Sequence, residues 1–178
     1  MDADERFTAF VRANTGSLLK TGFLLTRDPV EAEELVQDTL VWLYPRWNQV
    51  EQAEHQLAYV RKAAVNRFLA GRRRKSATEV HFDPELERST GQRPGRDETA
   101  EADERIAMWS ELGELSDRQR AAIVLRFFHD LPDDEVAQVL DCRVGTVRSL
   151  ISRSLVALRA RGSFTDDGVG STYLRNVR

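Results

Sequence analysis

The sequence lacks the features that would place the chain outside the cell or inside a membrane. Its 178 residues include a single cysteine, Cys142, so no disulfide can form within the chain, and this fits a reducing cytoplasm. No apolar run approaches the roughly 18–20 residues needed to cross a bilayer. The N-terminus is acidic and is not typical of a secretion signal. We therefore expect a cytoplasmic protein without membrane contact.

The motifs of the common enzyme and cofactor classes are also missing. The three histidines, His55, His81 and His129, are scattered and have no partners at metal-ligand spacing. There is no phosphate-binding glycine loop, no dinucleotide-binding glycine pattern and no nucleophile elbow. The paired acids Asp133 and Asp134 begin a predicted helix, where the helix dipole explains them better than acid–base catalysis does. The sequence thus predicts no enzyme, no cofactor and no metal site.

A net positive charge is absent as well. The chain has 26 Lys and Arg against 29 Asp and Glu, which is unusual for a protein that binds DNA unaided. The charges are unevenly distributed: residues 76–104 contain 9 acids and 3 bases, whereas residues 1–75 (10 and 12) and 105–178 (10 and 11) are nearly neutral. Prolines and glycines also interrupt the middle segment. The pattern predicts two domains joined by a flexible acidic linker at 76–104.

The first domain, residues 1–75, is predicted to be helical. A helix is expected to start after Asp28, because Asp28 is a good N-cap, Pro29 suits the first helical position and Glu31 completes a capping box. Pro45 is expected to end this helix.

A polar stretch at 48–56 is predicted to separate the helix that starts after Asp28 from a further long helix. Four apolar residues at helical spacing form the expected core face of that helix: Leu57, Val60, Ala64 and Phe68.

The second domain, residues 105–161, is also predicted to be helical. Ser116 and Gln119 form a capping box for a helix that extends to His129. The tail, residues 162–178, has no helical pattern and is expected to be loose. The whole chain is therefore predicted to be all-α.

Residues 133–153 form the most informative segment, because they predict two short amphipathic helices joined by a tight turn. Each helix places three apolar residues on one face: Val136, Val139 and Leu140 in the first, and Val144, Val147 and Ile151 in the second. The outer face of the second helix contains no acid and consists of Gly145, Thr146, Arg148, Ser149 and Ser152.

This arrangement is typical of a helix-turn-helix, whose second helix lies in the DNA major groove. Gly145 and Thr146 are small and would let the start of the helix approach DNA closely. Arginine and serine supply donors for guanine and phosphate. An ordinary αα-hairpin with a solvated polar face is the alternative. The absence of acids from the outer face favours DNA binding.

Three segments occur in an order and at a spacing typical of one family: AEELVQDTLVWLY, AYVRKAAVNRFLAGRRRK and LSDRQRAAIVLRFFHDLPDDEVAQVLDCRVGTVRSLISRSLVALR. With these segments the chain resembles the bacterial RNA polymerase sigma factors of the extracytoplasmic-function (ECF) group, in the sigma-70 superfamily. The resemblance covers about residues 5–75 and 105–161. Because several motifs occur together, it is far more specific than a lone helix-turn-helix would be.

The resemblance implies two small helical domains, sigma region 2 at 1–75 and the helix-turn-helix of sigma region 4 at 105–161. It implies an alternative sigma factor that binds core RNA polymerase and directs promoter recognition, DNA melting and transcription initiation. The implied partners are the β′ coiled coil and β flap of core polymerase, promoter DNA and, as a candidate, an anti-sigma factor. No cofactor is implied.

The resemblance also assigns site residues. One set on the helix at 32–43 resembles the polymerase-docking residues: Glu34, Gln37, Asp38, Val41 and Trp42. The stretch 50–56 resembles the loop that captures a flipped base, and the implied −10 contacts are Val50, Lys62, Ala63, Asn66, Arg72, Arg73 and Arg74. The implied −35 contacts are Arg126, Arg143, Thr146, Arg148, Ser149, Ser152 and Arg153.

Three residues of the helix-turn-helix depart from the family pattern. Pro132 stands where a hydroxyl N-cap is usual, Arg143 replaces a small residue or proline, and Leu150 replaces a common basic residue. These departures bear on which −35 sequence is read.

Two other functions fit parts of the sequence. The principal alternative is a stand-alone helix-turn-helix regulator of duplex operators, which would leave region 2 without a purpose. The other is a helical protein that binds only proteins, which the arginine-only recognition helix opposes.

Overall fold

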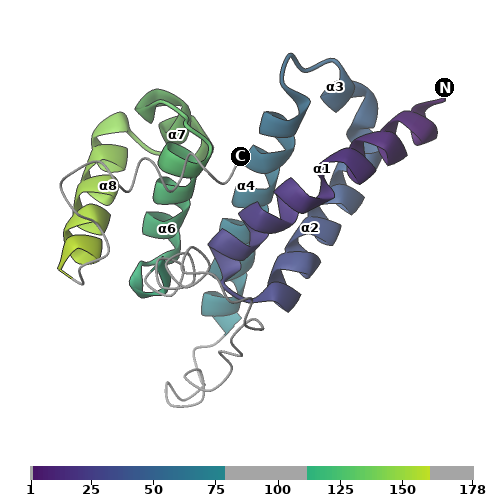
Figure 1. Cartoon of the computed structure of the whole chain (residues 1–178). Coiled ribbons are helices and arrows are strands. Elements are labelled where there is room, and N and C mark those ends of the chain that lie inside the picture. The colour runs from purple at the N-terminus through teal and green to yellow at the C-terminus, as the bar shows by residue number, and fades with distance from the viewer. Residues whose placement is uncertain (1, 79–111, 161–178) are drawn as a thin grey trace, which may run out of the picture.

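In the computed structural model, residues 2–78 and 112–160 are described, and every regular element within these two ranges is a helix (Figure 1). The predicted all-α class is confirmed. Nearly all of the acidic linker and all of the C-terminal tail 162–178 lie outside the described residues. Among the described residues, no helix is both long enough and apolar enough to cross a membrane.

The first half of the chain is a bundle of three long helices, α1 (Ala3–Thr26), α2 (Pro29–Leu43) and α4 (Gln56–Thr78), which pack against one another (Figure 1). Helix α1 begins with a capping box between Asp2 and Glu5 and ends at Arg27, whose φ of 63° turns the chain.

The start of α2 agrees with the prediction in part. Asp28 caps the helix by accepting from the backbone N–H groups of Val30 and Glu31. The predicted capping box is wrong in its second half, because the Glu31 carboxylate accepts from Arg72 at 2.7 Å and Lys75 at 3.2 Å. These ion pairs fasten the start of α2 to the end of α4.

The segment between α2 and α4 is more ordered than its polar composition predicted. A 3₁₀ turn, η1 (Tyr44–Arg46), leads into a short helix, α3 (Trp47–Glu51). Trp47 and Val50 point into the core of the first half, where the rings of Phe7 and Phe10 lie 5.2 and 5.0 Å from the Trp47 ring. Two buried side chains therefore make α3 part of the bundle.

The second half begins with a 3₁₀ turn, η3 (Leu112–Glu114), and continues through α6 (Asp117–Ile123) into a π-helical turn, η4 (Val124–Phe128). The capping box between Ser116 and Gln119 is confirmed. Two further helices, α7 (Asp133–Val139) and α8 (Val144–Arg159), complete the half.

The two halves pack directly against each other, which the sequence did not predict. Helix α6 contacts both α1 and α4, and α7 contacts α4. One apolar core crosses the boundary: Leu24, Leu25, Val65 and Phe68 from the first half belong to the same buried cluster as Leu115, Leu125 and Val136 from the second. This packing places Glu135 of α7 beside Lys62 of α4.

Candidate nucleic-acid interface

Helices α7 and α8 form the predicted helix-turn-helix. Three of the predicted core residues, Val136, Val139 and Leu140, are buried, and Val147 of α8 has no exposed surface. The turn between the helices uses Asp141 at a φ of 48°, and the Cys142 N–H donates to the Ala137 carbonyl at 3.0 Å. The Cys142 side chain is partly buried against the core.

The outer face of α8 is exposed as expected. A Cβ added to Gly145 would meet no atom within 4 Å, so the fold itself does not require glycine there and leaves space for an approaching ligand. Leu150, in contrast, packs partly buried against the core. The exposed side chains on this face and at its start are Arg143, Thr146, Arg148, Ser149, Ser152 and Arg153.

Arg126 comes from η4 and lies next to α8. Together with Arg148 and Ser152 it lines one open cleft, so three predicted −35 residues from two elements share a surface. The rim also contains Asp133, whose carboxylate lies 3.4 Å from Arg126 Nε and 3.2 Å from Arg148 Nε. Arg143 precedes α8 as its N-cap residue and makes no side-chain capping bond.

The predicted −10 residues of α4 differ in their accessibility. Asn66 is exposed, and Ala63 is partly buried against the core of the first half. Lys62 donates to Glu135 of α7 at 2.8 Å, so its ammonium group is already paired across the boundary between the halves. One of the three ammonium donors of Lys62 is thus engaged by Glu135, and the side chain is 33% exposed.

The prediction that the Val50 side chain contacts DNA is wrong. Its side chain has no exposed surface and is packed in the core of the first half. The sequence suggested a polar loop at this position, but the hydrophobic side chain is drawn inward with Trp47. Of the predicted capture loop, the exposed residues are Gln52, Glu54 and His55.

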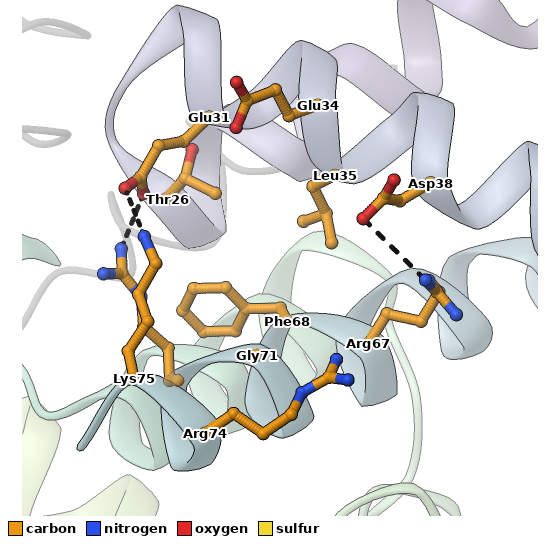
Figure 2. Close-up of a pocket in the computed structure, with 11 residues that line it drawn as sticks. Thr26, Glu31, Glu34, Leu35, Asp38, Arg67, Phe68, Gly71, Arg74 and Lys75 are labelled. Carbon is orange, nitrogen blue, oxygen red and sulfur yellow. Dashed lines mark hydrogen bonds and ion pairs between the residues drawn. The ribbon is translucent and has the colours of Figure 1, made fainter. Parts of the chain in front are cut away.

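The basic run at the end of α4 is partly engaged. Arg72 is bound to Glu31 and lies 5.5 Å from the centre of the Phe68 ring. Arg73 and Arg74 are exposed. Figure 2 shows the cleft between α2 and α4, with acids on α2 facing bases on α4.

The predicted polymerase-docking residues lie together on the outer surface of α2. Val41 is 74% exposed and Trp42 is 38% exposed, while Val36, Thr39 and Leu43 on the inner side are buried. The predicted docking role requires apolar side chains that are exposed in this way. The acidic and polar neighbours on the same surface are also exposed: Glu34, Gln37 and Asp38.

Two residues of the docking set, Asp38 and Trp42, also contact basic side chains of the protein itself. The Asp38 carboxylate lies 3.8 Å from Arg67 of α4 (Figure 2). The Arg46 guanidinium lies 4.5 Å from the centre of the Trp42 ring. Because the Asp38 side chain remains 74% exposed, it can still accept bonds from a partner.

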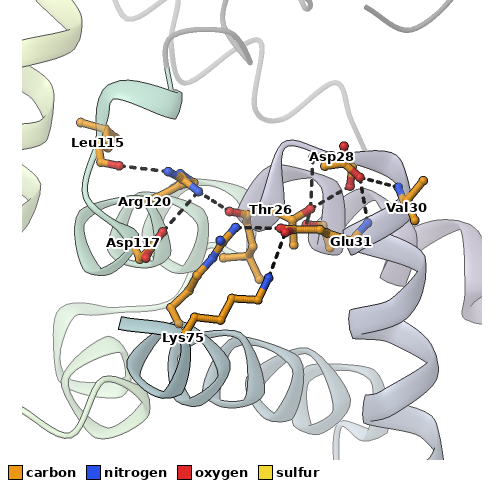
Figure 3. Close-up of polar contacts among 11 residues, drawn as sticks. Thr26, Asp28, Val30, Glu31, Lys75, Leu115, Asp117 and Arg120 are labelled. Carbon is orange, nitrogen blue, oxygen red and sulfur yellow. Dashed lines mark hydrogen bonds and ion pairs between the residues drawn. The ribbon is translucent and has the colours of Figure 1, made fainter. Parts of the chain in front are cut away.

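Arg120, which the sequence did not single out, is the most buried charged residue in the described part of the chain. Its guanidinium donates to three backbone carbonyls, those of Leu112 at 2.9 Å, Leu115 at 3.0 Å and Leu25 at 2.5 Å (Figure 3). Burial lowers the pKa of Arg120, and the nearby Asp117 partly offsets this effect. The sequence pattern could have indicated that Arg120 is buried, because it lies three and four residues before the core residues Ile123 and Val124 and so shares their helix face.

His129 and Arg61 also lie at the boundary between the halves. Burial, helped by the positive charge of Arg61, lowers the pKa of His129 to about 3, so its ring is neutral at physiological pH. The His129 Nε2 lies 3.4 Å from the Thr21 hydroxyl, and Arg61 donates to the Ser17 hydroxyl. Within residues 2–78 and 112–160, no group of three or more His, Cys, Asp and Glu residues could hold a metal ion.

Comparison with known proteins agrees with this geometry. Residues 105–158 match the family model described as Sigma-70, region 4. The RNA polymerase sigma-E factor of Streptomyces coelicolor is 31% identical over 153 residues, which cover 86% of this chain and 84% of that protein. The protein of the same name from Streptomyces avermitilis is 30% identical over 153 residues, with coverage of 86% and 83%.

A solved structure has the same fold. The sigma factor RpoE from Bartonella quintana, crystallised with the anti-sigma factor NepR, matches with a TM-score of 0.65 and 22% identity over 88% of this chain and 96% of that one. The helix-turn-helix, the helical bundle before it and the sequence similarity across both halves lead to one conclusion: the chain belongs to the ECF group of bacterial RNA polymerase sigma factors.

Proposed function

We propose that this sigma factor binds core RNA polymerase in the cytoplasm through the exposed face of α2 and directs it to promoters. In this proposal α8 and Arg126 bind the duplex −35 element, and the exposed side of α4 binds the unpaired −10 strand. Regions of the β′ coiled coil and β flap are the proposed polymerase contacts. Because the solved relative is bound to an anti-sigma factor, a protein of that kind is a further candidate partner.

One observation supports the DNA-reading part most strongly. The outer face of α8 exposes arginine, serine and threonine and no acid, while the inner face is fixed in the core by Val147 and Leu158. A rigid helix with such a face suits the major groove, where arginine recognises guanine O6 and N7. The proposal thus makes α8 the reader of duplex sequence.

The chemistry of α4 suits an unpaired strand. An amide such as that of Asn66 can donate to and accept from a base edge, while the adjacent arginines can hold phosphates. A Lys62 ammonium group that leaves Glu135 would add a further cation to this surface.

Co-purification with core RNA polymerase tests the proposal. The tagged chain, mixed with core polymerase, should elute as a stoichiometric complex that then binds promoter DNA. A chain that binds duplex DNA specifically but never binds core polymerase would instead be a stand-alone regulator. A chain that binds neither would be a helical interaction protein.

Replacing Arg148 by alanine should weaken −35 recognition. A bidentate arginine–guanine contact discriminates by about 1–3 kcal/mol, so Arg148→Ala should lose roughly that much promoter binding and relax base preference at one −35 position. Competition binding of reconstituted holoenzyme to promoters with single −35 changes measures both effects. Arg12→Ala, which removes an exposed arginine from α1, is the control. Undiminished selectivity in Arg148→Ala would show that α8 reads DNA with other residues.

Replacing Asn66 by alanine should weaken strand opening and spare duplex binding. Asn66 is exposed on α4 and its amide is proposed to contact the unpaired strand. Loss of such bonds should lower open-complex formation about tenfold. Permanganate reactivity of −10 thymines measures opening, and band shifts on a −35 duplex measure region 4 binding. Gln138→Ala, an exposed amide on α7, should behave like wild type. Normal permanganate reactivity in Asn66→Ala would contradict the assignment.

A further inference from the structure

The carboxylate of Asp133 lies between two arginines from different elements. Its Oδ1 lies 3.4 Å from Nε of Arg126 on η4, and its Oδ2 accepts a hydrogen bond of 3.2 Å from Nε of Arg148 on α8. Asp133 is the first residue of α7 and its side chain is only 29% exposed, so its carboxylate is largely shielded from solvent beside the two arginines.

This contact determines how Arg148 presents its guanidinium. The Arg148 side chain is 73% exposed, and without a partner it would sample many rotamers. Asp133 engages the Nε–H group and leaves the two terminal nitrogens available. Those nitrogens provide the remaining four of the five guanidinium donors, which suffice for the paired acceptors of guanine.

We propose that Asp133 is a specificity-determining residue that positions Arg148 and Arg126 for −35 reading; this rests on the proposed function. Held by Asp133, Arg148 keeps one orientation toward a base instead of moving to the nearest phosphate. The negative charge of Asp133 also offsets part of the positive charge that Arg126 and Arg148 present to the DNA backbone. Asp133 therefore increases discrimination between sequences while reducing affinity for DNA of any sequence.

Asp134 provides a matched control. It follows Asp133 in the first turn of α7, so it has the same charge and a similar place in the helix dipole. Its side chain is exposed and it makes no ion pair with the described residues. An effect seen for Asp133 and not for Asp134 therefore comes from the arginine contacts.

The experiment selects DNA with reconstituted holoenzyme from a duplex library with randomised sequence, and sequencing gives the base preference at each position. Full-length wild type, Asp133→Asn and Asp134→Asn are compared, each with Arg148 and with Arg148→Ala. Asp133→Asn should reduce the preference at the position that Arg148 reads by about three- to tenfold and should retain more non-cognate DNA. Asp134→Asn should match wild type. In the Arg148→Ala background, Asp133→Asn should cause no further loss at that position.

Each other result has a defined meaning. Identical preferences for Asp133→Asn and Asp134→Asn, with the wild-type preference intact, would overturn the inference alone. A wild-type holoenzyme without any −35 preference would overturn the proposed function and the inference with it. Asp133→Glu, which keeps the carboxylate, should restore most of the preference. An equal loss of preference in Asp133→Glu and Asp133→Asn would mean that Asp133 serves only to start α7, and this result would also overturn the inference.

Discussion

Replacing both Gln37 and Asp38 by arginine is expected to abolish holoenzyme formation while leaving the helical content unchanged. Both side chains are exposed on α2, next to the exposed Val41 and Trp42, and the opposite side of the helix is buried. The double substitution reverses the charge of the proposed docking face. An acidic docking face is expected to meet a basic surface on the polymerase. Because like charges facing each other in an interface cost several kcal/mol, core binding should weaken by about a hundredfold or more.

Competition between labelled wild-type chain and each variant for core polymerase measures this effect. The matched control replaces Asp134 and Gln138 by arginine: these residues are exposed on α7, and the change in composition and net charge is identical. The control should compete like wild type. If the α2 double variant forms holoenzyme at wild-type affinity, polymerase docks elsewhere.

Replacing Arg120 by alanine is expected to destabilise the protein strongly. The Arg120 side chain binds the carbonyls of Leu112, Leu115 and Leu25, and its removal leaves these acceptors without their donor next to a cavity. Truncating a buried, hydrogen-bonded charge typically costs about 3–5 kcal/mol. Urea denaturation followed by circular dichroism should therefore show a midpoint well below that of wild type.

Arg118 provides a graded comparison on the same helix. It is exposed and donates to one carbonyl, that of Leu140, at 2.8 Å. Arg118→Ala should lose only about 1 kcal/mol. Equal stability of Arg120→Ala and wild type would mean that the carbonyls of Leu112, Leu115 and Leu25 find other donors and that the halves are not held by this contact.

Local signals in the sequence predicted much of the fold. The caps at Asp28 and Ser116 fixed two helix starts because their side-chain oxygens bind N–H groups two or three residues away. Apolar spacing predicted the buried faces of α7 and α8. Each of these features depends on residues close together in the chain.

Features that depend on distant residues were not predicted. Val50 was assigned to DNA, but Trp47 and the phenylalanines of α1 draw that segment into the core. The pairing of Lys62 with Glu135 joins residues 73 positions apart, and no local pattern encodes it. The same holds for Arg120, because one of its acceptors, Leu25, lies 95 positions away. Packing within the first half determines the position of Val50, and packing between the halves determines the contacts of Lys62 and Arg120; local periodicity encodes neither.

Promoter-dependent run-off transcription tests the sigma-factor function most directly. Core RNA polymerase would be incubated with promoter fragments drawn from the randomised-library selection, with and without the purified chain. Core polymerase alone should give no specific transcript, and addition of the chain should give a transcript from one start site that disappears when the −10 or −35 element is changed. Formation of the complex with core polymerase but no specific transcript from any selected fragment would contradict the assignment.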